Sequence, residues 1–316
     1  DIQEKLSEDI ETAVIASNGD TSTLPDILLV QDNSFQKFVT NYPEVYADLT
    51  GKYDYEGFAE GKLAYSIVDG KNHGIPFDAG TAVAAYRTDY LEAAGYTAAD
   101  LKDITWESCG ASMFNEDGSV NLKDNEQLKE VIDFYATMVK EGIFIEVNTW
   151  DEYIGTLSNQ TVVGTIQGCW ILSTIMSLDT QKGLWAMTNL PKLVKAEGAT
   201  NYSSNGGSSW AIINDKDLDL ALDFMYRNVD FYNEILPATS AIATYTPAKE
   251  GSNYTAGSEF FNGEPIFAEI VEFGAQTPSN ITGPYYYDAR EALGTAITNI
   301  ILQGGDVDTE LATAED

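Results

Sequence analysis

Residues 69–95 read DGKNHGIPFDAGTAVAAYRTDYLEAAG and contain three local signals in succession. The polar start has the glycine and asparagine content of a turn. The apolar run 81–86 is typical of a buried strand, and residues 88–94 have helical spacing that ends at Gly95, a residue favoured just after a helix. A turn, a strand and a helix in this order indicate an α/β unit.

The same alternation occurs on both sides of this unit. Helical spacing predicts a first helix over residues 1–17, and the short apolar run 26–30 predicts a buried parallel strand. Gln31, Asp32 and Asn33 follow that strand at its carboxyl end, the edge of an open α/β sheet where ligands bind. Later segments predict helices at 125–141, 151–157, 218–229 and 288–303, and strands at 161–168 and 208–213. The predicted fold class is therefore α/β.

Composition narrows the range of partners. The chain has 316 residues, a length typical of two domains, and its 50 acidic against 17 basic residues give a net charge of −33. Such a charge excludes nucleic acid and anionic lipid as direct partners, since both bind through Lys and Arg. With 44% hydrophobic residues the chain still builds packed cores.

Few residues are available for metal, redox or nucleophilic chemistry. Cys109 and Cys169 form one disulfide at most and are expected to be buried apolar fillers. His73 is the single histidine, so zinc sites and Ser-His-Asp triads not built on it are excluded. Phosphate-loop and calcium-loop motifs are missing, and no run approaches the ~18 apolar residues of a membrane span. We expect no cofactor and no metal.

Two kinds of residue bear on function: the many carboxylates, and the aromatic residues in polar turns. Carboxylates are so abundant that their positions in the sequence cannot identify a catalytic pair. Glu264, Glu269 and Glu272, for example, are most simply a solvated helical face. A glycoside hydrolase therefore stays open as an alternative. Aromatic residues in polar turns are more informative, because sugar rings stack on aromatic faces while their hydroxyls bind polar side chains. Four clusters have this character: residues 31–33, 76–78 and 168–170, and 285–287 with Arg290.

At these clusters the sequence resembles the extracellular solute-binding proteins of bacterial ABC importers, in the carbohydrate-binding, maltose-binding-protein-like group. Residues 23–32 are similar to the family's PDI strand, and residues 69–91 resemble its DGKxYGVPF…YYNKDLF stretch. Residues 168–170 resemble its GxW element, residues 206–210 its GGxx segment, and residues 285–287 its aromatic wall before the last helix. The order and spacing of the motifs carry the resemblance.

The resemblance implies a two-lobed periplasmic-binding-protein-like fold that closes on a ligand in the interlobe cleft. The first lobe would comprise residues 1–82 with 210–275, and the second residues 83–209 with 276–316. Against this family the chain is short, with the difference expected at its start and after Trp106. The ligand contacts implied by the family are Asp32, Asn33 and Asp78 as hydrogen-bonding groups, Trp170 and Tyr286 as stacking rings, Gly206, Gly207 and Ser208 as backbone or hydroxyl groups, and Trp210, Trp150 and Arg290 as further contacts.

The expected function is that of a receptor without catalytic residues. It would capture a neutral oligosaccharide and deliver it to the transmembrane subunits of an ABC permease. We expect a monomer at the extracellular face of the membrane, held by a lipid anchor that lies outside this chain along with the signal. A secreted glycoside hydrolase and a surface adhesion module are the alternatives that the sequence leaves open.

Overall fold

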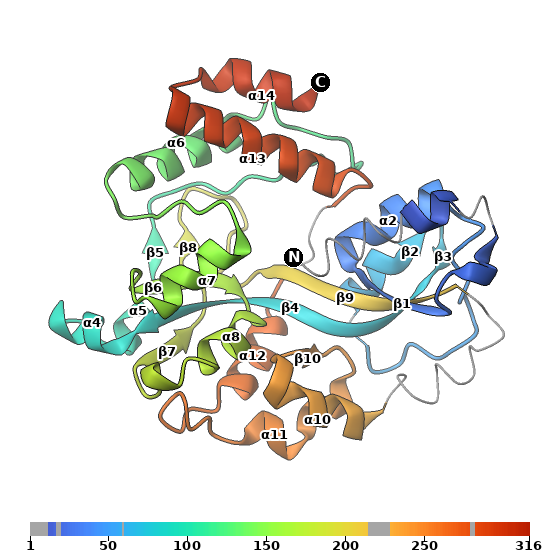
Figure 1. Cartoon of the computed structure of the whole chain (residues 1–316), viewed down its shortest axis with the longest axis horizontal. Coiled ribbons are helices and arrows are strands. Elements are labelled where there is room, and N and C mark those ends of the chain that lie inside the picture. Colours follow the sequence, from blue (N-terminus) through green and yellow to red (C-terminus); the bar gives the residue numbers. More distant parts are fainter. Residues whose placement is uncertain (1–11, 17–19, 59, 214–227, 279–281) are drawn as a thin grey trace.

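The computed structural model describes residues 12–16, 20–58, 60–213, 228–278 and 282–316 (Figure 1). Residues 12–16 are helical, as expected, and the rest of the predicted first helix lies outside the described residues. The predicted helix 218–229 also lies outside them, apart from its last two residues. Within the described ranges, no helix combines the length and the apolar content needed to cross a bilayer.

Strands and helices alternate along the chain. The strands are β1 (Ile27–Gln31), β2 (Ile67–Val68), β3 (Lys71–Asn72), β4 (Gly74–Arg87), β5 (Thr105–Trp106), β6 (Gly164–Gly168), β7 (Trp185–Thr188), β8 (Lys192–Leu193), β9 (Ser204–Ile212) and β10 (Ile242–Ala243). The helices are α2 (Asp32–Asn41), α3 (Glu60–Leu63), α4 (Thr88–Ala93), α5 (Ala98–Leu101), α6 (Glu126–Lys140), α7 (Trp150–Ser158), α8 (Ile171–Met176), α10 (Val229–Thr239), α11 (Ser252–Thr255), α12 (Ile266–Gly274), α13 (Tyr286–Gln303) and α14 (Val307–Glu315).

The long strand β4 joins two sets of strands. Its first half pairs with β9 in antiparallel register, from Gly74 opposite Ala211 to Thr81 opposite Ser204. Its second half pairs with β6 and β7. In Figure 1, β4 and β9 cross the molecule side by side and connect the part that holds α2 with the part that holds β6 and β7.

Besides a small core around Leu49, Ile75 and Ile212, three hydrophobic cores lie among the described residues. One packs beneath α2, a second lies between the second half of β4 and helices α8 and α10–α12, and a third lies among α6, α13 and α14. Their central residues are Val30, Phe35, Val45 and Ala211 in the first, Val83, Ile171, Tyr232 and Ile270 in the second, and Leu122, Ile132 and Leu311 in the third.

The division into lobes remains a proposal. Tyr232 and Ile270 share a core with Val83 and Ile171. Because a lobe is built around its own core, this packing favours grouping residues 229–274 with the body that contains Val83. Val14, Val45 and Ala211 of the proposed first lobe pack with α2 and β1.

The predicted parallel arrangement of the first strand is wrong. β1 pairs with β9 in antiparallel register, from Ile27 opposite Ile212 to Gln31 opposite Ser208. Its residues alternate between half-buried and buried, as expected for a strand with unequal faces. The short apolar run identified a strand, but its partner lies about 180 residues away in sequence, so no local pattern defines the direction of pairing.

Candidate functional site

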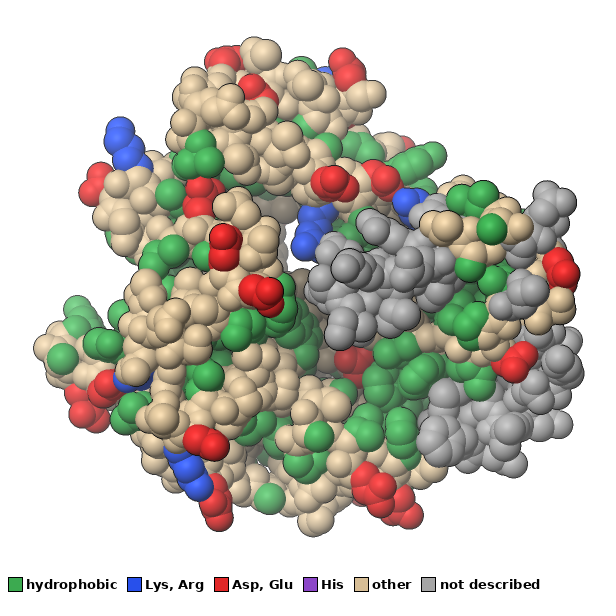
Figure 2. Space-filling model, viewed as in Figure 1, with side chains coloured by type: hydrophobic (Ala, Val, Ile, Leu, Met, Phe, Trp, Pro, Cys, Tyr) green, Lys and Arg blue, Asp and Glu red, His purple; other side chains and the backbone are tan. Residues whose placement is uncertain are grey.

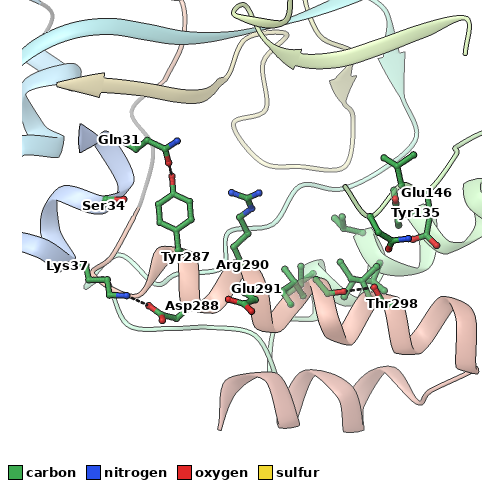
Figure 3. Close-up of a pocket in the computed structure, with 18 of the residues that line it drawn as sticks. Gln31, Ser34, Lys37, Tyr135, Glu146, Tyr287, Asp288, Arg290, Glu291 and Thr298 are labelled. Carbon is green, nitrogen blue, oxygen red and sulfur yellow. Dashed lines mark hydrogen bonds and ion pairs between the residues drawn. The ribbon is translucent and has the colours of Figure 1, made fainter. Parts of the chain in front are cut away.

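A cavity of about 870 Å³ lies between α2 and α13, with α6 as a further wall. In Figure 2 a hollow opens at the centre of the face shown, with basic side chains near its upper edge. Gln31, Ser34 and Lys37 line the cavity from β1 and α2, and Tyr287 and Arg290 line it from α13. Figure 3 shows Tyr287 and Arg290 extending from α13 in the same direction. The volume falls within the range of small-molecule sites.

Two side-chain contacts connect α2 and α13 at the edge of this cavity. The Tyr287 hydroxyl donates a hydrogen bond to Gln31 Oε1, and Lys37 Nζ lies 3.6 Å from Asp288 Oδ2 (Figure 3). The Arg290 guanidinium lies over the Tyr287 ring, with its carbon 5.7 Å from the ring centre. The cavity therefore offers an aromatic ring, a guanidinium and an amide, groups that bind neutral hydroxylated ligands.

The predicted stacking residue Trp170 belongs to an aromatic group beside β9. Its Nε1 donates to the Asn205 carbonyl at 3.1 Å, and its ring centre lies 5.5 Å from that of Trp150. Trp150 in turn stacks on Tyr153 at 5.2 Å. Because Trp150 remains 38% exposed and Trp170 is half-buried, both rings keep surface that a ligand can cover.

A buried charge cluster connects Lys62 of α3 with α2, β4 and β9. Lys62 donates to the carboxylate of Asp32, to the Asp78 carbonyl at 2.8 Å and to the Ser208 carbonyl at 2.7 Å. Asp32 Oδ1 accepts a further bond from Ser209 Oγ at 3.0 Å, and Asp78 Oδ1 accepts one from the Ser208 amide at 2.7 Å. Asp32 and Asp78 thus have protein partners here, and their role as ligand contacts stays a prediction.

Burial controls the protonation of both carboxyls. It raises the pKa of Asp32 from its ordinary value of 3.8 to about 6, with Lys62 opposing the rise and Asp78 adding to it. Burial also raises the pKa of Asp78, again against the effect of Lys62. The ammonium therefore compensates only part of the cost of removing the carboxylates from water.

We expect stability to fall as the pH rises from about 4 to 6. Asp32 holds its proton longer in the folded chain than in the unfolded chain, because its folded pKa is about 6 and its ordinary value is 3.8. Over this interval the native state binds more protons, which lowers the free energy of unfolding by up to ~1.4 kcal/mol per pH unit. Urea unfolding at several pH values measures this slope. Asp32→Asn should remove this contribution, and equal slopes in the two proteins would contradict it.

Gly207 lies where a side chain cannot fit. Its φ is +103°, and a Cβ there would lie 2.7 Å from Asp32 Oδ2 and 3.2 Å from the Asp78 carbonyl. Gly207→Ala should therefore lower the free energy of unfolding by about 1–3 kcal/mol more than Gly198→Ala. Gly198 is the matched control, since its φ is +70° and no atom lies within 4 Å of its Cβ position. Equal losses in urea unfolding would exclude the close contact as a cause.

Three further predicted contacts lie in three different elements, α2, β9 and α13. Asn33 is half-buried in the first turn of α2, and its Oδ1 has no hydrogen-bond partner in the described part of the chain. Trp210 packs on Phe77 at 5.1 Å, and its buried Nε1 likewise lacks a partner among the described residues. Tyr286 stacks on Phe114 at 6.2 Å.

Sequence reasoning included Tyr287 in the cluster 285–287 but chose Tyr286 as the stacking ring, and it did not select Lys62. Tyr287 precedes the predicted helix 288–303 by one residue. The observed helix begins at Tyr286, which puts Tyr287 and Arg290, three residues apart, on one face. Lys62 carried no signal, since two of its three acceptors lie on Asp32 and Ser208, 30 and 146 residues away.

Comparisons with known proteins agree on one family. A family model described as bacterial extracellular solute-binding protein matches residues 2–256. The chain is 31% identical to the lactose-binding protein of Rhizobium radiobacter over 354 residues, which cover 100% of this chain and 82% of that protein.

Solved structures confirm the two-lobed α/β fold. The ABC transporter-associated binding protein of B. animalis subsp. lactis in complex with β-1,6-galactobiose matches with a TM-score of 0.75 and 17% identity, over 96% of this chain and 86% of that one. The galacto-N-biose/lacto-N-biose I-binding protein of Bifidobacterium longum also has a TM-score of 0.75, with 18% identity over 98% of this chain and 84% of that one.

Proposed function

The chain belongs to the bacterial extracellular solute-binding proteins, and from this premise we propose that it is the carbohydrate receptor of an ABC importer. It captures a neutral oligosaccharide between two closing lobes and delivers it to the permease. The family is one of binding proteins, which agrees with a receptor that does no chemistry on its ligand.

The observation that carries the proposal is the convergence of two aromatic groups on one segment of β9. On one side, Trp170 donates a hydrogen bond to the Asn205 carbonyl. On the other side, Gln31 pairs with Ser208 across β1 and β9 and accepts a hydrogen bond from Tyr287. Residues 205–208 therefore lie between an aromatic pair and the Tyr287 side of the cavity. Stacking surface combined with hydrogen-bonding groups suits a sugar, whose ring has apolar faces and a polar edge.

The relatives support a disaccharide or a short oligosaccharide as the ligand. Lactose, β-1,6-galactobiose and lacto-N-biose are named with the proteins that resemble this chain. A cavity of about 870 Å³ has room for a ligand of that size. We extend the proposal to Asp32, Asn33, Asp78, Trp170, Gly207, Ser208, Tyr286, Trp210, Trp150 and Arg290 as candidate contacts, and add Gln31 and Tyr287.

The cellular setting follows from the family and the charge. We propose that the protein acts as a monomer outside the cell, held near the permease by a lipid anchor. A net charge of −33 keeps such a surface population dispersed through mutual repulsion, while a neutral sugar is indifferent to it. Acidic side chains are scattered over the face shown in Figure 2, as expected for molecules that repel one another.

A thermal-shift panel tests the ligand class. Ligand at ~100 times its Kd adds ~2.7 kcal/mol to stability, so a matching disaccharide should raise Tm by several degrees while amino acids and peptides leave it unchanged. The same sugars are then recovered and analysed. Intact sugar agrees with a receptor, shortened products would favour a glycoside hydrolase, and a Tm rise with peptides alone would overturn the carbohydrate assignment.

A further inference from the structure

A second cavity, of about 290 Å³, has no residue of α13 in its wall. Its walls come from Ala79–Thr81 of β4, from Ser204 and Gly206 of β9, and from residues 274–278 at the end of α12. Ile242 and Ile270 add apolar surface. None of the aromatic residues assigned to sugar binding lines it, and Asp32 is the one proposed sugar contact in its wall.

Lys249 brings an uncompensated positive charge to this cavity. It lies in the short 3₁₀ helix Thr246–Glu250, is half-buried, and has no ion pair or hydrogen bond with any described side chain. Burial alone lowers the pKa of its ammonium, with no neighbouring carboxylate to counteract the effect. In a chain with 50 acidic residues, a half-buried lysine without a counter-ion is unexpected.

The other charges at this cavity cancel. Lys62 and Asp32 also line it, and they pair with each other. The Lys62 ammonium donates its other two hydrogen bonds to the carbonyls of Asp78 and Ser208. Among the described residues, the cavity therefore presents one available cation, together with the hydroxyl of buried Thr81.

We propose that this cavity binds a small monocarboxylate, whose carboxyl group pairs with Lys249 while its alkyl part packs on Ile242 and Ile270. One available ammonium matches one negative charge, and no second cation remains among the described lining residues to pair with another. Apolar walls favour an anion with an alkyl part over a strongly hydrated inorganic ion. A charged partner also offsets the cost of burying the Lys249 ammonium.

Calorimetric titration of the sugar-free protein with butyrate tests this proposal. We expect one saturable site, at least about tenfold weaker in Lys249→Met, since bonds between charged groups account for at least a factor of this size. Lys182→Met is the matched control, because Lys182 pairs on the surface with Glu259 at 2.8 Å and should bind butyrate as the wild type does. Sulfate should bind more weakly than butyrate.

Absence of a saturable site for butyrate up to about 100 mM, where Kd values up to the millimolar range are measurable, would overturn the proposal. Equal butyrate affinity in Lys249→Met, or tighter binding of sulfate, would also overturn it. Because these titrations contain no sugar, their failure leaves the carbohydrate proposal standing, and the failure of that proposal leaves this one standing.

A second measurement does not depend on a variant that folds. In wild-type protein with ¹³C-methylated lysines, the Lys249 signal should titrate at lower pH than the signals of surface lysines. Butyrate should move that titration upward by favouring the charged amine. A Lys249 titration unaffected by saturating butyrate would contradict the site.

Discussion

Trp170→Ala is expected to weaken binding of the cognate sugar by about tenfold or more. Aromatic stacking contributes ~0.5–1.5 kcal/mol beyond area burial, and the loss of ring area adds to this. The ring is held in place by its bond to the Asn205 carbonyl and by Trp150, so its half-buried face is ready for a ligand. Titration calorimetry of wild type and variant gives the ratio of Kd values.

Trp106→Phe is the control for this substitution. Trp106 packs on Phe134 and Phe144, with ring centres 6.1 and 6.2 Å away, and should contribute nothing to the sugar site. Its variant should keep the wild-type Kd. Unchanged affinity in Trp170→Ala would mean that Trp170 does not contact the sugar.

Lys62→Met should lower the free energy of unfolding by about 3 kcal/mol or more. The substitution leaves the Asp32 carboxyl buried without its cation and leaves the Asp78 and Ser208 carbonyls without their donor. Breaking a buried ion pair on one side costs about 3–5 kcal/mol, and each unsatisfied buried acceptor adds to the loss. Urea unfolding at pH 7 measures the change.

The double variant separates charge from packing. Replacing Asp32 with Asn in the Lys62→Met background removes the uncompensated carboxylate and should restore part of the lost stability. Lys182→Met, which breaks an exposed pair with Glu259, should change stability by less than ~1 kcal/mol. If Lys62→Met behaved like Lys182→Met, the buried cluster would contribute little to the stability of the fold.

Local signals predicted the elements well, and long-range pairing limited the rest. Gly95 ends the region of α4 with φ +85°, and Asn125 caps α6 by accepting a bond from the Leu128 amide at 3.0 Å. Both depend only on neighbouring residues. The direction of β1 was missed because its partner β9 comes much later in the chain.

In the candidate site, too, features that depend on neighbouring residues could be predicted, and features that depend on long-range contacts could not. The Trp170 and Tyr285–Tyr287 clusters were visible as aromatics in polar turns, and the structure places Trp170 beside Trp150 and Tyr287 beside Arg290. The partner of Asp32 was not visible, because an acidic chain offers many carboxylates and nothing local selects Lys62. Which member of a cluster faces a cavity depends on helix phase and on packing, and motif spacing defines neither.

The central claim is that this chain binds a neutral sugar between its lobes. Titration calorimetry of the wild-type protein with lactose, β-1,6-galactobiose and lacto-N-biose at pH 7 tests it most directly. We predict saturable binding of at least one of them at one site per chain, with an affinity insensitive to salt because the ligand carries no charge. Absence of binding to every sugar, together with saturable binding of a peptide or a metal ion, would contradict the account.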